Sequence, residues 1–190
     1  MKSRSLCPML SLALLLSLSA LAFAHSGADA DGPSNAQKSF DKLKTLAGTW
    51  QGRATIDPPQ PDMKPGNLTQ ISIRVTSRGN ALVHEMQEAG TPLDPANYDH
   101  PLTMFYLDAN RLTLVHYCDA GNRPRMVARS SADDKTIEFD FVDLSGANDY
   151  GHMYHAVFTF IDANHHTEDW TFMMPGNKPV HGHLDLVRSK

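Results

Sequence analysis

Cysteine is scarce in this sequence. The chain has 190 residues and two cysteines, Cys7 and Cys118. Cys7 lies in an N-terminal apolar stretch that we expect to be removed, which would leave one cysteine in the mature chain. A single cysteine cannot form an intramolecular disulfide, so a hydrophobic core must stabilise the fold. The roughly 166 residues that remain are enough for one domain with such a core.

An excess of positive charge is also missing, as are the common catalytic motifs. The formal net charge of -4 offers no basic surface to a nucleic acid, so we expect no such partner. The sequence has no Gly-rich phosphate loop, no Gly-x-Ser-x-Gly, no His-Glu-x-x-His and no Cys-x-x-Cys. We therefore predict no catalytic residue and favour a protein that is not an enzyme. A weak hydrolase or isomerase is the remote alternative.

The first 24 residues have the three parts of a secretory signal peptide. Lys2 and Arg4 give a positive start, an apolar stretch follows, and Ala22-Phe23-Ala24 matches the small-x-small cleavage pattern. A membrane anchor is the competing interpretation, but Pro8 and several serines interrupt the apolar stretch and nothing later is apolar enough to span a bilayer. We expect cleavage after Ala24, export to the periplasm or the extracellular space, and no membrane association afterwards.

The mature chain begins with a small, polar leader over residues 25–33, and one domain is expected over 34–190. Ser34 is a suitable N-cap for a short helix in which Phe40, Leu43 and either Leu46 or Ala47 recur at helical spacing. Short alternating segments then follow, separated by turns rich in Gly, Pro, Asn and Asp. The predicted strands are 49–56, 68–76, 80–88, 101–107, 110–118, 124–130, 135–143, 151–161, 166–174 and 179–188.

A meander of about ten strands tends to close on itself, because closure removes the exposed edges. The predicted fold class is therefore all-β: an up-and-down antiparallel β-barrel with one short N-terminal helix at a barrel mouth. A two-sheet sandwich fits the same strand count and is the alternative.

The segment "FDKLKTLAGTWQGRA" resembles the start of calycin-type barrels. It is similar to bacterial lipocalin-like families of unknown function and, more distantly, to nitrobindin-like haem-binding barrels; "HHTEDWTFMMPGNKPVHGHLDLVRSK" resembles the closing hairpin of the former. The resemblance implies that Trp50 plugs one barrel end beneath Arg188, as a structural contact. It also implies that His183, near the C-terminus, would be the haem ligand of a haem-binding barrel.

Side chains of a strand point alternately to its two faces, and this alternation separates the histidines of "GHMYHAVFTFIDANHHTEDWTF". His152 and His155 point to opposite faces of a strand, whereas His181 and His183 share one, as strand-borne zinc ligands do. If the last hairpin turns at Gly176-Asn177, Phe172 lies opposite His181. One face then carries His155, His166, Glu168, Trp170, Phe172, His181 and His183. The other face carries Ala156, Phe158, Leu184 and Leu186 and is the more apolar, so we expect the histidine face to be outside and assign no metal ligand.

The predicted function is to bind a small hydrophobic or amphipathic molecule inside the barrel. One or two of His84, His116 or a tyrosine would fix its polar end. Together with them, the predicted ligand-binding residues are Met86, Met126, Phe139 and Phe141. A haem- or metal-binding barrel that uses His183 is the alternative, with haem as the candidate cofactor. A barrel without a ligand that acts through its surface is the simplest alternative.

Overall fold

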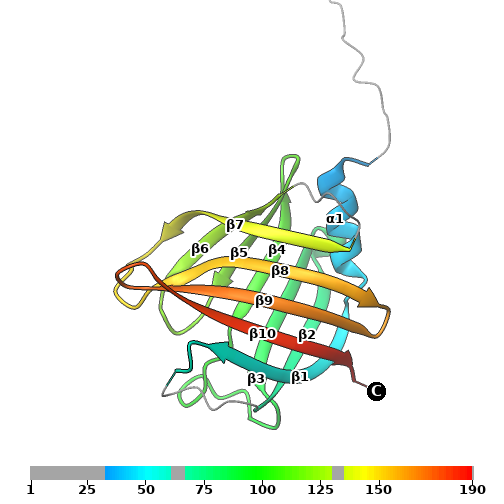
Figure 1. Cartoon of the computed structure of the whole chain (residues 1–190). Coiled ribbons are helices and arrows are strands. Elements are labelled where there is room, and N and C mark those ends of the chain that lie inside the picture. The colour runs from blue at the N-terminus through cyan, green and yellow to red at the C-terminus, as the bar shows by residue number, and fades with distance from the viewer. Residues whose placement is uncertain (1–32, 61–66, 130–134, 190) are drawn as a thin grey trace, which may run out of the picture. The chain divides into compact units, whose positions relative to one another are not determined.

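The computed structural model describes residues 33–60, 67–129 and 135–189, so the predicted signal peptide lies outside the described residues. One helix and ten strands make up this part of the chain (Figure 1). They are α1 (Asn35–Lys44), β1 (Gly48–Asp57), β2 (Leu68–Thr76), β3 (Ala81–Glu88), β4 (Leu102–Asp108), β5 (Arg111–Tyr117), β6 (Arg123–Ala128), β7 (Thr136–Ser145), β8 (His152–Asp162), β9 (His165–Met174) and β10 (Lys178–Arg188). A short 3₁₀ turn, Ser77–Gly79, joins β2 to β3.

Each strand pairs antiparallel with its neighbours in sequence, and β10 returns to pair with β1. The barrel is therefore closed and leaves no strand edge unpaired. This confirms the predicted up-and-down barrel with one short helix at its end, and it excludes the two-sheet sandwich.

α1 lies at one mouth of the barrel, leads into β1 and packs against β4 and β5 (Figure 1). The Ser34 hydroxyl caps the helix by accepting a hydrogen bond from the Gln37 backbone N–H at 3.2 Å. Phe40 and Leu43 of α1 are buried and belong to the barrel core. We call this the helix mouth. The opposite end, where β1–β2, β3–β4, β5–β6, β7–β8 and β9–β10 are connected, is the far mouth.

Trp50 is fully buried beneath the helix mouth. Its indole N–H donates to the Leu46 carbonyl at 2.7 Å, and the Arg188 guanidinium lies 4.1 Å from the ring centroid. Arg188 also donates to the Ala47 carbonyl at 2.8 Å. The predicted stack of Arg188 on Trp50 is confirmed, and it fastens the last strand to the first and to the helix end.

Gly48 and Gly52, two residues before and after Trp50, lie where β10 comes too close to leave room for a side chain. Gly48 has a φ of +140°, and a side chain there would collide with the Arg188 guanidinium. A Cβ at Gly52 would overlap the backbone carbonyl of Asp185 on β10. The Gly-x-Trp-x-Gly motif thus marks the place where the barrel closes.

The structure corrects the predicted register of β9. The last hairpin has three loop residues, 175–177, rather than two, so Phe172 lies opposite Val180 and Trp170 opposite Gly182. The preceding turn at Ala163-Asn164 is as predicted, but a bulge near Ile161 shifts the following β8–β9 pairs by one residue, and a second near Tyr154 shifts the last pairs again. The longer loop and the bulge near Ile161 place the alternate residues His166, Glu168 and Trp170 inside the barrel, where they are buried, although they were expected outside.

The other residues that we assigned to a face of β8 or β10, and that are named here, lie on the predicted face. Ala156, Phe158, Leu184 and Leu186 belong to the buried core. His155 is half-buried on the outer wall, and His181 and His183 are exposed there.

We predict that Gly52→Ala destabilises the protein by at least about 2 kcal/mol, because the new methyl group must push β10 away from β1. Gly182→Ala is the matched control on β10: its Cβ would be 3.5 Å from the Ile56 side chain, which is an ordinary contact. Urea unfolding of both variants measures the difference. Equal stability of the two variants would contradict this explanation of the motif.

Candidate functional site

A buried carboxylate lies at the centre of the barrel. Glu168 on β9 is completely buried and accepts hydrogen bonds from three side chains. The donors are His84 Nε2 at 3.0 Å, His166 Nε2 at 3.0 Å and Trp170 Nε1 at 3.0 Å. His84 comes from β3, which is not adjacent to β9 in the barrel, so this contact crosses the interior.

Glu168 is held in its ionised form. Burial alone would raise its pKa, but the charge of His84 and the hydrogen bonds from His166 and His84 outweigh burial and hold the pKa well below its usual range. The interior therefore contains a buried carboxylate whose oxygens are bonded to ring N–H groups. A buried charge needs such well-placed hydrogen bonds to offset the cost of its removal from water.

A second polar pair continues across the neighbouring strands. His84, Thr103 and His116 are lateral neighbours on β3, β4 and β5, and all three are buried. The Thr103 hydroxyl lies 2.9 Å from His116 Nδ1. Burial, and then the charge of His84, lowers the pKa of His116 to about 4, so its imidazole is neutral near pH 7.

His116 Nε2 is a buried polar atom without a hydrogen-bond partner in the described part of the chain. His166 Nδ1, beside Trp50, is another. When the Thr103 hydroxyl donates to Nδ1, the neutral His116 ring carries its proton on Nε2, which is then a donor. Buried donors are nearly always bonded to protein, water or ligand, so this nitrogen offers a position for a ligand's acceptor atom.

Aromatic rings surround the polar groups. The Trp170 ring centroid lies 5.8 Å from that of His116, 5.9 Å from His84 and 5.6 Å from Phe158. Phe105 packs against Phe158 at 5.5 Å. These contacts hold the two histidine rings from the apolar side, next to the buried carboxylate.

The six predicted ligand-binding residues occupy three kinds of place. His84 and His116 belong to the central network, the name we give to the hydrogen-bonded or adjacent buried residues of the interior: His84, Thr103, His116, His166, Glu168 and Trp170. Met126 and Phe139 are fully buried in the core. Met86 and Phe141 are half-buried and pack against that core towards the far mouth.

Sequence reasoning missed the part of the network that comes from β9. Glu168 and Trp170 alternate with His166 on one face, which is a signal of a shared environment. The predicted register assigned that face to solvent, so the signal was read as a polar exterior. Thr103 carried no signal of its own, because threonine is common in strands.

His183 does not suit a haem held inside the barrel. Its side chain is on the outer wall, 47% exposed, and its Nδ1 lies 2.6 Å from Asp169 Oδ1. An axial ligand to an enclosed haem would have to face inwards, as His84 and His116 do.

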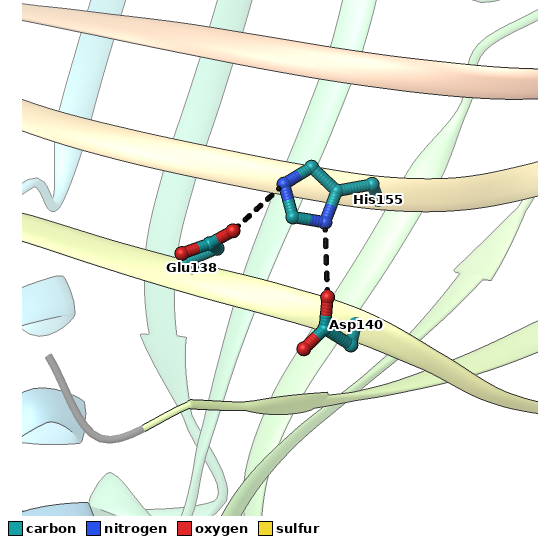
Figure 2. Close-up of side chains that lie close together, drawn as sticks. All are labelled: Glu138, Asp140 and His155. Carbon is teal, nitrogen blue, oxygen red and sulfur yellow. Dashed lines mark ion pairs between the residues drawn. The ribbon is translucent and has the colours of Figure 1, made fainter. Parts of the chain in front are cut away.

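A separate group of ligand-type side chains lies on the outer wall (Figure 2). His155 on β8 is between two carboxylates of β7: its Nε2 is 3.2 Å from Glu138 and its Nδ1 is 3.3 Å from Asp140. In the described residues this is the one group of three whose ligand atoms all lie within 4.8 Å. However, the Arg129 guanidinium is paired with Asp140, at 2.6 Å through Nη2, and with Glu138 at 3.5 Å. Both ring nitrogens and both carboxylates are thus already paired, as in a surface salt-bridge network.

Comparison with known proteins identifies no family for this chain. No family model matches it, and no curated protein matches it. Among solved structures it is similar to a protein of unknown function from the DUF3598 family of Nostoc punctiforme, with 11% sequence identity and a TM-score of 0.40. The match covers 77% of this chain and 48% of that protein, so this chain spans about half of its length. Among the described residues, no helix is long and apolar enough to cross a membrane.

We predict that Glu168→Gln destabilises the fold by about 3 kcal/mol or more. Three buried N–H groups bond to the two carboxylate oxygens, and a neutral amide has only one acceptor oxygen and no charge to strengthen those bonds. Glu138→Gln, which changes a carboxylate on the outer wall, should cost less than about 1 kcal/mol. Denaturant unfolding at pH 7 compares the two variants. A Glu168→Gln protein as stable as Glu138→Gln would show that the buried carboxylate does not organise the interior.

The pKa of His116 predicts a loss of stability in mild acid. The unfolded chain takes up the proton near pH 6.5 and the folded chain only near pH 4, so folding becomes less favourable as the pH falls through this window. The difference corresponds to roughly 3 kcal/mol lost by pH 4. In His116→Gln this part of the pH dependence should disappear, whereas His181→Gln should keep it. Unfolding free energies measured at intervals between pH 7 and pH 4 test this, and identical profiles for the wild type and His116→Gln would contradict it.

Proposed function

We propose that this protein is an exported barrel of the calycin type that binds a small amphipathic molecule through its far mouth. The observation that carries the proposal is the unpartnered, buried Nε2 of His116. A barrel that only had to fold would gain stability from an apolar side chain at this position. A bound acceptor atom gives this nitrogen the partner that the protein does not provide.

The apolar part of the molecule would lie between His116 and the far mouth. Met86, Phe141 and Met153 are partly buried there and pack against the core. Methionine side chains are unbranched and rearrange readily, so two of these three residues can move aside for a ligand. This arrangement provides an adaptable apolar surface rather than a rigid cavity.

The rim of the far mouth supports access from this end. Residues 95–100 and 117–119 line a recess of about 450 Å³. Large apolar side chains are exposed around the same end: Leu68, Leu93, Tyr98, Tyr117, Tyr150 and Met174. Exposed apolar side chains that gather at one end of a protein are typical of ligand or partner sites.

The central network also indicates the chemistry of the bound group. Glu168 already accepts hydrogen bonds from His84, His166 and Trp170, and His116 is neutral near pH 7. An ionised ligand group would therefore find no unpaired opposite charge among these residues. A neutral acceptor, such as a carbonyl or a hydroxyl oxygen, is the group that suits a neutral imidazole N–H.

Two neutral fluorescent dyes test the proposal, prodan, which has a ketone acceptor, and N-phenyl-1-naphthylamine, which has none. We expect both to bind the wild type and quench Trp170. His116→Phe should weaken prodan binding about ten-fold, as expected for one lost hydrogen bond in a buried site, and leave the naphthylamine unchanged. His181→Gln on the outer wall is the control and should leave both affinities unchanged.

Mass spectrometry of what can be extracted from the purified protein complements the titration and should show an amphipathic compound. An empty extract together with no binding of either dye would refute the proposal, and equal prodan binding to the wild type and His116→Phe would remove His116 from it. A haem titration covers the alternative: a Soret shift that disappears in His183→Ala would support the haem-binding function instead.

A further inference from the structure

Two histidines of β10 project outwards from the barrel, on the face of the strand that points away from the central network. His181 and His183 are exposed, and Gly182 between them faces the barrel interior opposite Trp170. Alternate residues of a strand lie on one face, with their Cα atoms roughly 6.7 Å apart. Two imidazoles at this spacing can turn towards each other and bind one ion.

Each of these rings is held by a hydrogen bond at the same nitrogen. His183 Nδ1 lies 2.6 Å from Asp169 Oδ1, and His181 Nδ1 lies 3.1 Å from the Thr171 hydroxyl. Both partners come from β9, directly beside β10. A histidine that is bonded through Nδ1 presents Nε2 to a ligand, and a carboxylate on Nδ1 makes Nε2 a better metal donor.

An acidic residue on the other neighbouring strand is suitably placed to be a third ligand. Asp57 on β1 is the direct cross-strand partner of His181 and is exposed. Adjacent strands are about 4.8 Å apart, so its carboxylate can reach an ion bound to the two imidazoles. Two histidines and one carboxylate, completed by water, form a donor set typical of zinc.

The group around His155 is less suited to bind a metal ion, because its side chains are already paired with one another and with Arg129 (Figure 2). Both ring nitrogens of His155 are paired with carboxylates, and Arg129 is bonded to those same carboxylates. A metal ion would have to displace a guanidinium and break both histidine contacts. His181 and His183 each retain a second nitrogen that these hydrogen bonds do not use.

We propose that His181 and His183, with Asp57, form a binding site for a divalent late transition metal on the outer wall of the barrel, with Zn²⁺ as the representative ion. Thr171 and Asp169 are positioning residues that orient the two rings. This site uses none of the residues of the central network and is independent of the ligand proposed for the interior.

Isothermal titration of the full mature chain with Zn²⁺ tests the proposal, with Ca²⁺ as the ion that such a site should reject. We expect one Zn²⁺ to bind, and His181→Gln and His183→Gln each to weaken binding more than ten-fold. Asp169→Asn should weaken it by about ten-fold, the usual effect of removing a carboxylate that orients a metal-binding histidine. Asp57→Asn should also weaken it, whereas His155→Gln should not.

Thermal unfolding gives a second measurement that does not depend on the heat signal. Zn²⁺ should raise the melting temperature of the wild type and of His155→Gln, because it binds the folded chain, but not that of His181→Gln. All the substituted residues are exposed or half-exposed, so the variants should fold without Zn²⁺ as the wild type does. Absence of Zn²⁺ binding, or binding that survives His181→Gln and His183→Gln, would overturn the proposal; binding lost in His155→Gln would assign the metal to the other group.

Discussion

The buried contact between Glu168 and His84 is the constraint on which the interior of this barrel depends. It joins two strands that are not neighbours in the sheet, and both side chains are removed from water. The carboxylate is satisfied only because His166 and Trp170 also donate to it. The nearby His116 is neutral near pH 7, because burial, and then the charge of His84, lowers the pKa of its imidazole to about 4.

The two ends of the barrel have different roles. At the helix mouth, Trp50 and Arg188 join the first strand, the last strand and the end of α1, and two glycines permit that close approach. At the far mouth, half-buried methionines and exposed tyrosines replace the close packing. This difference between the two ends is the basis of our proposal that a ligand would enter at the far mouth.

The sequence predicts the architecture well and the interior only in part. Alternation and turn residues predicted the ten strands, and the Gly-x-Trp-x-Gly resemblance predicted the contact of Trp50 with Arg188. His84 and His116 were recognised as inward histidines, but Glu168 and Trp170 were assigned to the exterior. One bulge near Ile161 and one additional loop residue decide that face, and neither has a clear signal in the sequence. The outward direction of His181 and His183 was predicted, but the hydrogen bonds that orient their rings become visible only with the β9 register.

¹⁵N NMR of the histidine rings tests most directly the proposal that His116 holds a neutral ligand group through Nε2. We expect His116 to stay neutral from pH 7 down to about pH 4, with its proton on Nε2, and we expect this nitrogen's resonance to shift when prodan is added. A His116 ring that titrates near pH 6.5, or whose Nε2 resonance is unchanged by saturating prodan, would contradict it.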